Sequence, residues 1–191
     1  MPPIRLLVAE RDITTLRVDA IVNSADPLRL GRGGINGEIH RVAGPRLLCA
    51  SQRLRNKPAG AVKLTLGYGL PARYILHAVA PTAHGPTNEE HHLLAQCYRR
   101  CLALASQRRF RTLVFPVLGS GCRGFAFQLA ATIALTEIRR FLELDAILER
   151  VIVTVYDDRG FDLSILAKEL LGYYMDEGRL LNGQHWDSAY W

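Results

Sequence analysis

A glycine-rich loop lies between an apolar stretch and a helical pattern in the run VDAIVNSADPLRLGRGGINGEIHRVAGP, residues 18–45. The first N–H groups of a helix have no intrahelical partner and attract anions. Glycines let the backbone approach a phosphate closely, and successive N–H groups can form an anion nest. The run therefore predicts a phosphate site, although a single glycine-rich loop is also typical of an ordinary turn.

A second loop of the same kind has the sequence GSGCRGF, from Gly119 to Phe125. It follows the apolar residues FPVL and precedes a helical pattern that starts at Phe127. Two junctions of strand, glycine loop and helix in one small domain are harder to explain as plain turns than one such junction. Together the two loops predict a site for a diphosphate.

The elements that must position these loops follow from the pattern of apolar residues. Short stretches rich in Val, Ile and Leu predict strands, and several are apolar on both faces, which indicates a sheet covered by helices on each side. Helical spacing predicts helices over Glu89–Gln107 and Phe127–Leu142, and a third helix follows Asp162. The fold class is therefore α/β. The expected strands are Ile4–Val8, Ala20–Val22, Val62–Leu66, Tyr74–Val79, Thr112–Leu118 and Val151–Tyr156.

The overall composition favours one globular domain, since 49% of the 191 residues are hydrophobic and 22% are charged. No apolar stretch has the length of a signal peptide or of a membrane span, so we expect a cytoplasmic protein without membrane contact. The formal net charge of +6 favours anionic ligands. Arginine pairs fall in helical patterns without interleaved aromatic residues, which is typical of solvated helix faces, so a nucleic-acid partner is not expected.

The four cysteines form no CxxC pair, and their spacing predicts reduced thiols. Cys97 and Cys101 share a helical pattern with His91 and His92, so a metal site is one interpretation. Small side chains buried on one helix face are the commoner explanation of such a pattern. We expect no metal.

The two loops and their surroundings resemble the macrodomain family, whose signature runs from VDAIVN through an N-A-A-N-like element and GGGG-V-D-G-x-I-H to A-A-G-P. Three later segments agree in the same order: GYGLPARYILHAVAP at 67–81, FPVLGSGCRGF at 115–125 and VIVTVYDD at 151–158. The resemblance implies a three-layer macrodomain fold over residues 1–175, with a mixed six- or seven-stranded sheet between helices, followed by a C-terminal tail over 176–191. It also implies ADP-ribose as the ligand.

The resemblance further implies roles for individual residues. Asp12 matches the aspartate that accepts a hydrogen bond from the adenine amino group, with Ile13 beside it, and Tyr156 matches the position against which adenine packs. From their types alone, a turn cap for Asp12 and a core ring for Tyr156 are the ordinary roles. Phe125 is expected to border the distal ribose. The diphosphate loops comprise Gly33, Gly34 and Ile35 in the first, and Ser120, Gly121, Cys122, Gly124 and Phe125 in the second.

Two residues expected at the distal ribose exchange their side-chain types relative to the family. Catalytic members carry Asn in N-A-A-N and Asp in V-D-G, and the matching positions here are Asp26 and Asn36. Arg32 stands where the family usually has glycine and could reach a phosphate. His40 and His77 match positions that look structural.

The activity that the resemblance implies is ester hydrolysis, either deacetylation of O-acetyl-ADP-ribose or removal of mono-ADP-ribose from acidic side chains of modified proteins. Asp26 would position or deprotonate a water and Asn36 would orient a ribose hydroxyl, without any cofactor. The alternative is a reader module that binds ADP-ribose without turnover. We expect the hydrolase because Asp26 keeps a carboxylate near the ribose.

Overall fold

The computed structural model describes residues 5–25, 33–52, 57–83, 85 and 87–155. In this part of the chain, six strands form one mixed sheet in the order β1-β6-β5-β2-β4-β3. All neighbours are parallel except β3, which pairs with β4 in the antiparallel direction at one edge. The strands are β1 Leu6–Glu10, β2 Ala20–Ser24, β3 Val62–Leu66, β4 Tyr74–Ala78, β5 Thr112–Pro116 and β6 Arg150–Val155.

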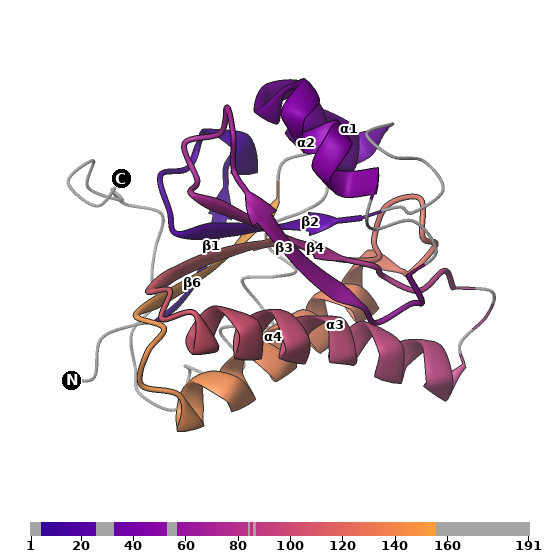
Figure 1. Ribbon diagram of the computed structural model, residues 1–191. Helices are drawn as coiled ribbons and strands as arrows, with labels where there is room; N and C mark the ends of the chain where they lie inside the picture. The colour runs from indigo at the N-terminus through magenta and orange to yellow at the C-terminus, as the bar shows by residue number, and fades with distance from the viewer. Residues whose placement is uncertain (1–4, 26–32, 53–56, 84, 86, 156–191) are drawn as a thin grey trace.

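Helices cover both faces of the sheet, so the expected three-layer α/β fold is confirmed (Figure 1). Helices α1 (Gly34–Ala43) and α2 (Pro45–Ser51) lie on one face, and α3 (Asn88–Gln107) and α4 (Phe127–Leu144) lie on the other. A short 3-10 helix, η1 (Ile13–Thr15), follows β1. The helix α2 was not among the expected ones, although a proline at its first position is a local signal for a helix start.

The core consists of two apolar layers, because successive side chains of a strand point to opposite faces. Ile21 of β2 and Ile75 of β4 belong to the layer under α1 and α2. Their neighbours Val22 and Leu76 belong to the layer that α3 and α4 cover. This alternation explains why the central strands read as continuous apolar runs in the sequence.

The observed bounds differ from the expected ones mainly at strand ends. The strand β5 ends at Pro116 and not at Leu118, since proline offers no N–H to continue a ladder. The third helix expected after Asp162, and the tail, lie outside the described residues. Cys97 and Cys101 are buried on α3, and burial raises the pKa of both thiols. Among the described residues, no group of His, Cys, Asp and Glu is arranged to hold a metal, and no helix is long and apolar enough to span a membrane.

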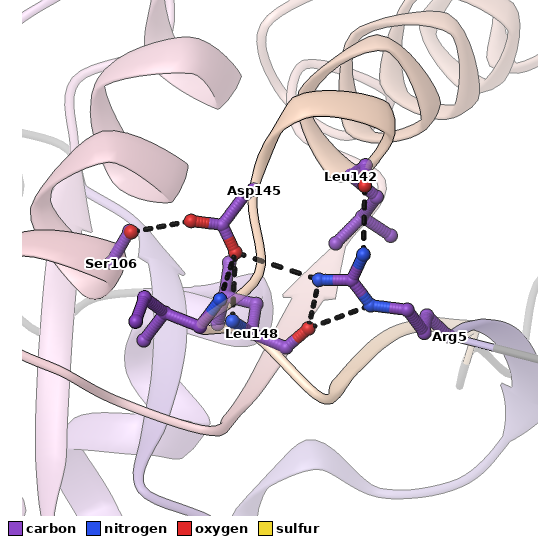
Figure 2. A network of polar contacts seen from close by, with 6 residues as sticks. Arg5, Ser106, Leu142, Asp145 and Leu148 are labelled. Atoms are coloured by element: carbon purple, nitrogen blue, oxygen red, sulfur yellow. Dashed lines mark hydrogen bonds and ion pairs between the residues drawn. The ribbon is translucent and has the colours of Figure 1, made fainter. Parts of the chain in front are cut away.

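A partly buried polar network joins the start of β1 to the connection between α4 and β6 (Figure 2). Arg5 donates to the carbonyl oxygens of Leu142, at 2.7 Å, and Leu148, at 2.9 Å, and lies 3.5 Å from the carboxylate of Asp145. Asp145 accepts hydrogen bonds from Ser106 at the end of α3, at 2.5 Å, and from the N–H groups of Ile147 and Leu148. The network thereby fixes the edge strand β1 against both helices of one layer.

Candidate functional site

The two glycine loops follow neighbouring strands, after which the chain passes to helices on opposite faces of the sheet. Strands β2 and β5 are parallel neighbours, so their carboxyl ends lie at the same edge. After β2 the chain passes to α1 on one face, and after β5 it passes to α4 on the other (Figure 1). Such a reversal opens a crevice at the carboxyl ends of the strands, where α/β proteins bind their ligands.

The first loop ends at Gly33 and Gly34, which open α1 in left-handed backbone conformations with φ of +71° and +52°. A Cβ atom added to either glycine would meet no atom within 4 Å, so open space lies in front of both. The first N–H groups of α1 have no intrahelical acceptors, and the helix dipole adds partial positive charge there. This helix start can therefore receive an anion such as a phosphate.

The second loop contains three glycines with different physical roles. Gly119 and Gly124 have φ of +87° and +82°, and an added Cβ would lie 3.0 Å from the Phe125 ring and 3.3 Å from the Ala83 carbonyl oxygen, respectively. These two glycines are needed for the turn itself. Gly121 has no such φ and faces open space, so nothing in the described residues requires a glycine there. Its absent side chain leaves room for a ligand.

Arg123 connects the second loop to the end of β2, a role that the sequence pattern did not reveal. Its guanidinium donates to the Ala25 carbonyl oxygen at 3.3 Å and to Thr82 Oγ1 at 2.9 Å, and its own carbonyl accepts from the Ala83 N–H at 2.7 Å. The only hint of this role in the sequence is that an arginine stands within a glycine-rich loop. The bridge ties the second loop to the end of β2 and to residues 82–83, and it places a positive charge there.

Several of the expected ligand-binding residues have well-defined structural contacts. Asp12 caps η1, because its Oδ1 accepts from the N–H and the hydroxyl of Thr14 at 2.8 and 2.7 Å. A carboxylate has a second oxygen that can accept an adenine amino group. Ile13 and Phe125 are 2% and 5% exposed and belong to the two core layers, whereas Cys122 is exposed. The adenine and ribose roles stay predictions.

A buried chain of polar side chains lies under the first turn of α1. Asn36 Oδ1 accepts from Asn23 Nδ2 at 2.9 Å, and the same nitrogen lies 3.2 Å from His77 Nδ1. His77 Nε2 lies 2.9 Å from Thr65 Oγ1. Asn23 and His77 are polar residues in largely apolar strands, which is the sequence signal that could have identified them. The hydrogen bond from Asn23 thus holds Asn36, an expected site residue, from the side of the sheet.

The histidines near Asn36 are poor candidates for a base. Burial, together with the charge of nearby His40, lowers the pKa of His77 to about 3, so the ring is neutral at physiological pH. Burial also lowers the pKa of His40. Within the described part of the chain, His40 Nδ1 and Asn23 Oδ1 are buried without a hydrogen-bond partner, and such atoms are suited to a bound water or a ligand hydroxyl.

The structure brings together Gly33, Gly34, Ile35 and Asn36 at one loop and Ser120 to Phe125 at the other. Ser120 stabilises its own loop by donating to the Val117 carbonyl oxygen at 2.8 Å. Three expected residues, Asp26, Arg32 and Tyr156, lie outside the described residues. Their positions relative to the crevice stay predictions.

Comparisons with known proteins agree with this architecture. Residues 22–134, which include both loops, match the family model described as Macro domain. A macro domain-containing protein of Chlorobaculum tepidum is 45% identical over 152 residues, covering 80% of this chain and 88% of that protein. An O-acetyl-ADP-ribose deacetylase of Enterobacter cloacae subsp. cloacae is 40% identical over 160 residues, covering 82% and 89%. The Oceanobacillus iheyensis macrodomain with ADP has a TM-score of 0.81 at 35% identity, covering 88% and 91%.

Proposed function

This chain belongs to the macrodomain family, and on that premise we propose that its crevice binds ADP-ribose and hydrolyses ester-linked derivatives of it. The observation that carries the proposal is the open space in front of Gly33, Gly34 and Gly121, on two loops at the carboxyl ends of adjacent parallel strands. Two anion-binding loops on either side of one crevice suit a diphosphate, whose negative charges both loops can contact.

The two ends of the ligand extend from the diphosphate in this proposal. Adenine lies toward η1, where Asp12 accepts from its amino group and Tyr156 packs against the ring. The distal ribose lies toward Asn36 and Asp26. The relatives support ADP-ribose as the ligand, since the O-acetyl-ADP-ribose deacetylase of Enterobacter cloacae subsp. cloacae is 40% identical to this chain.

The reaction breaks an ester at the distal ribose. A water molecule adds to the ester carbonyl carbon, the bond from that carbon to the ribose oxygen breaks, and the ribose oxygen leaves as a hydroxyl after taking a proton. Asp26 positions the water and accepts its proton, while Asn36 orients the ribose. The loops fix the diphosphate, which holds the ester in place for attack.

A reader module is the second candidate, and one observation favours it. Position 36 carries an amide in place of the family's carboxylate, and an amide cannot accept a proton from water at neutral pH. A base displaced by about 1 Å can cost about a hundredfold in rate. A reader needs the same crevice and no base.

Calorimetry followed by a turnover assay tests both candidates. We expect ADP-ribose to bind more tightly than AMP, because AMP lacks the second phosphate and the distal ribose. Equal affinity for AMP contradicts the assignment of the crevice. Product formation from O-acetyl-ADP-ribose supports the hydrolase, whereas tight ADP-ribose binding without turnover leaves the reader.

A further inference from the structure

The polar side chains under α1 occupy a part of the core where polar atoms are costly to bury. Asn23 and His77 are each 0% exposed and are register partners on β2 and β4, on the face where Ile21 and Ile75 pack. A buried polar group without a hydrogen bond destabilises the fold, because it loses its contacts with water and gains none in return. The directions of these hydrogen bonds are therefore strongly constrained.

A backbone carbonyl at one end of the chain of hydrogen bonds favours one direction. Thr65 Oγ1 lies 3.1 Å from the Leu66 carbonyl oxygen, so it can donate its one hydrogen there and accept from His77 Nε2, in agreement with the placement of Asn23 Nδ2, a donor, beside His77 Nδ1. The hydrogen of the neutral His77 ring consequently lies on Nε2. Its Nδ1 atom is then an acceptor and requires a donor from Asn23.

Asn23 transmits this direction to the helix. Its Nδ2 group carries two hydrogens, of which one goes to His77 Nδ1 and the other to Asn36 Oδ1. If His77 did not accept from it, the Asn23 amide could turn over and present its oxygen instead. Asn36 would then have to turn as well, since two oxygens cannot share a hydrogen bond without a hydrogen.

We propose that His77 is a positioning residue, which fixes the Asn36 amide with its oxygen toward the sheet and its N–H group away from it. Asn36 Oδ1 accepts the hydrogen bond from Asn23 Nδ2, and this bond fixes the orientation of the amide. The Asn36 amide therefore presents its N–H group, and not its oxygen, on the side away from the sheet. A carboxylate at the same position would offer an acceptor.

The direction has a consequence for the ligand that rests on the function proposed above. A donor at position 36 recognises an oxygen acceptor on the distal ribose or its ester, and not a hydroxyl hydrogen. ADP lacks the distal ribose, so its binding does not use this donor. The contribution of His77 is therefore expected in the difference between the binding affinities for ADP-ribose and for ADP.

The ligand-free protein tests the hydrogen-bond direction directly. In ¹⁵N-labelled protein, long-range proton–nitrogen spectra identify which ring nitrogen carries hydrogen, and the His77→Asn variant assigns the signal. We expect the neutral ring with hydrogen on Nε2 from about pH 6 to 8, consistent with burial. A ring with hydrogen on Nδ1, or a charged ring, overturns the proposal whatever the protein binds.

Two variants and a control test the consequence by calorimetry with ADP-ribose and ADP. His77→Leu removes the acceptor, and we expect about a tenfold loss of ADP-ribose affinity with ADP affinity within about twofold, the size of one hydrogen bond. His77→Asn keeps an acceptor near Nδ1 and should recover most of the loss. His92→Leu removes an exposed histidine of α3 and should change neither affinity.

The outcomes separate this proposal from the proposed function. An equal loss for both ligands, or no loss for either, means that His77 only fills the core and contradicts its positioning role. If the parent protein does not bind ADP-ribose at all, the proposed function fails, and the ring tautomer still decides the direction of the hydrogen bonds. If His77→Leu does not fold, the tautomer and His77→Asn decide.

Discussion

In the proposed function, Asp26 and Asn36 determine whether the protein hydrolyses its ligand or only binds it. Asp26→Asn should lower turnover of O-acetyl-ADP-ribose by at least about a hundredfold, because it removes the group that accepts a proton, while ADP-ribose affinity stays near that of the parent. Asn36→Asp should retain or raise activity, since one oxygen of the introduced carboxylate can replace Oδ1 beside Asn23 and the other can accept a proton. Steady-state kinetics and calorimetry measure both effects. An inactive parent, with activity only in variants that carry Asn36→Asp, identifies a reader.

Asp12 combines a structural contact with a proposed ligand contact, so its test needs two variants. Asp12→Ala should weaken ADP-ribose binding by about 1–3 kcal/mol, the cost of deleting a charged hydrogen-bond partner. It also removes the cap of η1. Asp12→Asn keeps a side-chain oxygen for the Thr14 N–H and should bind with an intermediate affinity. A folded Asp12→Ala variant that binds ADP-ribose as tightly as the parent rules out the adenine contact.

Glycine variants in the two loops can separate an effect on stability from an effect on ligand binding. Gly121→Val should abolish ADP-ribose binding with little change in melting temperature, because the added side chain enters space in front of the loop and meets no protein atom near its Cβ. Gly33→Val should also abolish binding but lower the melting temperature, since φ of +71° strains a branched residue. Differential scanning calorimetry checks both variants. A large fall in the melting temperature of Gly121→Val would show that the glycine is needed for the turn.

The network of Arg5 and Asp145 should make the attachment of β1 sensitive to acid. Partial burial acts to raise the pKa of Asp145, but hydrogen bonds from Ser106, Leu148 and Ile147 and the Arg5 charge outweigh it and lower the pKa. Its stabilisation is therefore present above the ordinary pKa of an aspartate and lost as pH falls through the lowered value. At about pH 7, Asp145→Asn should reduce the free energy of unfolding by about 1.5–3 kcal/mol.

Urea unfolding at about pH 7 and at about pH 3 measures how much Asp145→Asn lowers the free energy of unfolding. The difference in the free energy of unfolding between Asp145→Asn and the parent should narrow at the lower pH, because the unfolded parent chain then binds a proton at this aspartate. Glu143→Gln is the matched control, because Glu143 pairs with Arg139 on the exposed surface of α4 and such pairs contribute about 0–1 kcal/mol. A constant difference at both pH values contradicts the role of the Asp145 charge.

At the scale of the whole molecule, the net charge of +6 attracts anions without selecting among them. A diphosphate ligand neutralises few charges, so ADP-ribose affinity should fall by no more than about tenfold between roughly 50 and 200 mM salt. Proteins with about 6–10 phosphate contacts to DNA lose about 10³–10⁵ over the same range. Calorimetry in a salt series checks this. If affinity falls as steeply as it does for DNA-binding proteins, and an oligonucleotide binds tightly at low salt, the partner is a nucleic acid instead.

The sequence by itself determined the features that depend on local chemistry. Short stretches rich in Val, Ile and Leu located all six described strands, and apolar residues at helical spacing located α3 and α4, because these patterns follow from local backbone geometry. The glycine runs at residues 31–37 and 119–124 identified two loops as candidate phosphate sites, because glycine lets the backbone approach an anion closely. The family resemblance supplied the ligand and the functional roles, which local chemistry does not contain.

Only the tertiary structure decided which distant residues meet. The pairing of β2 with β5 brings the two loops to the same edge of the sheet, and Arg123 reaches Ala25 only because of that pairing. The contact of Asn36 with His77 through Asn23 likewise depends on how α1 packs over β2 and β4. Strand order and packing arise from burial of apolar surface across the whole chain, and no local pattern specifies them.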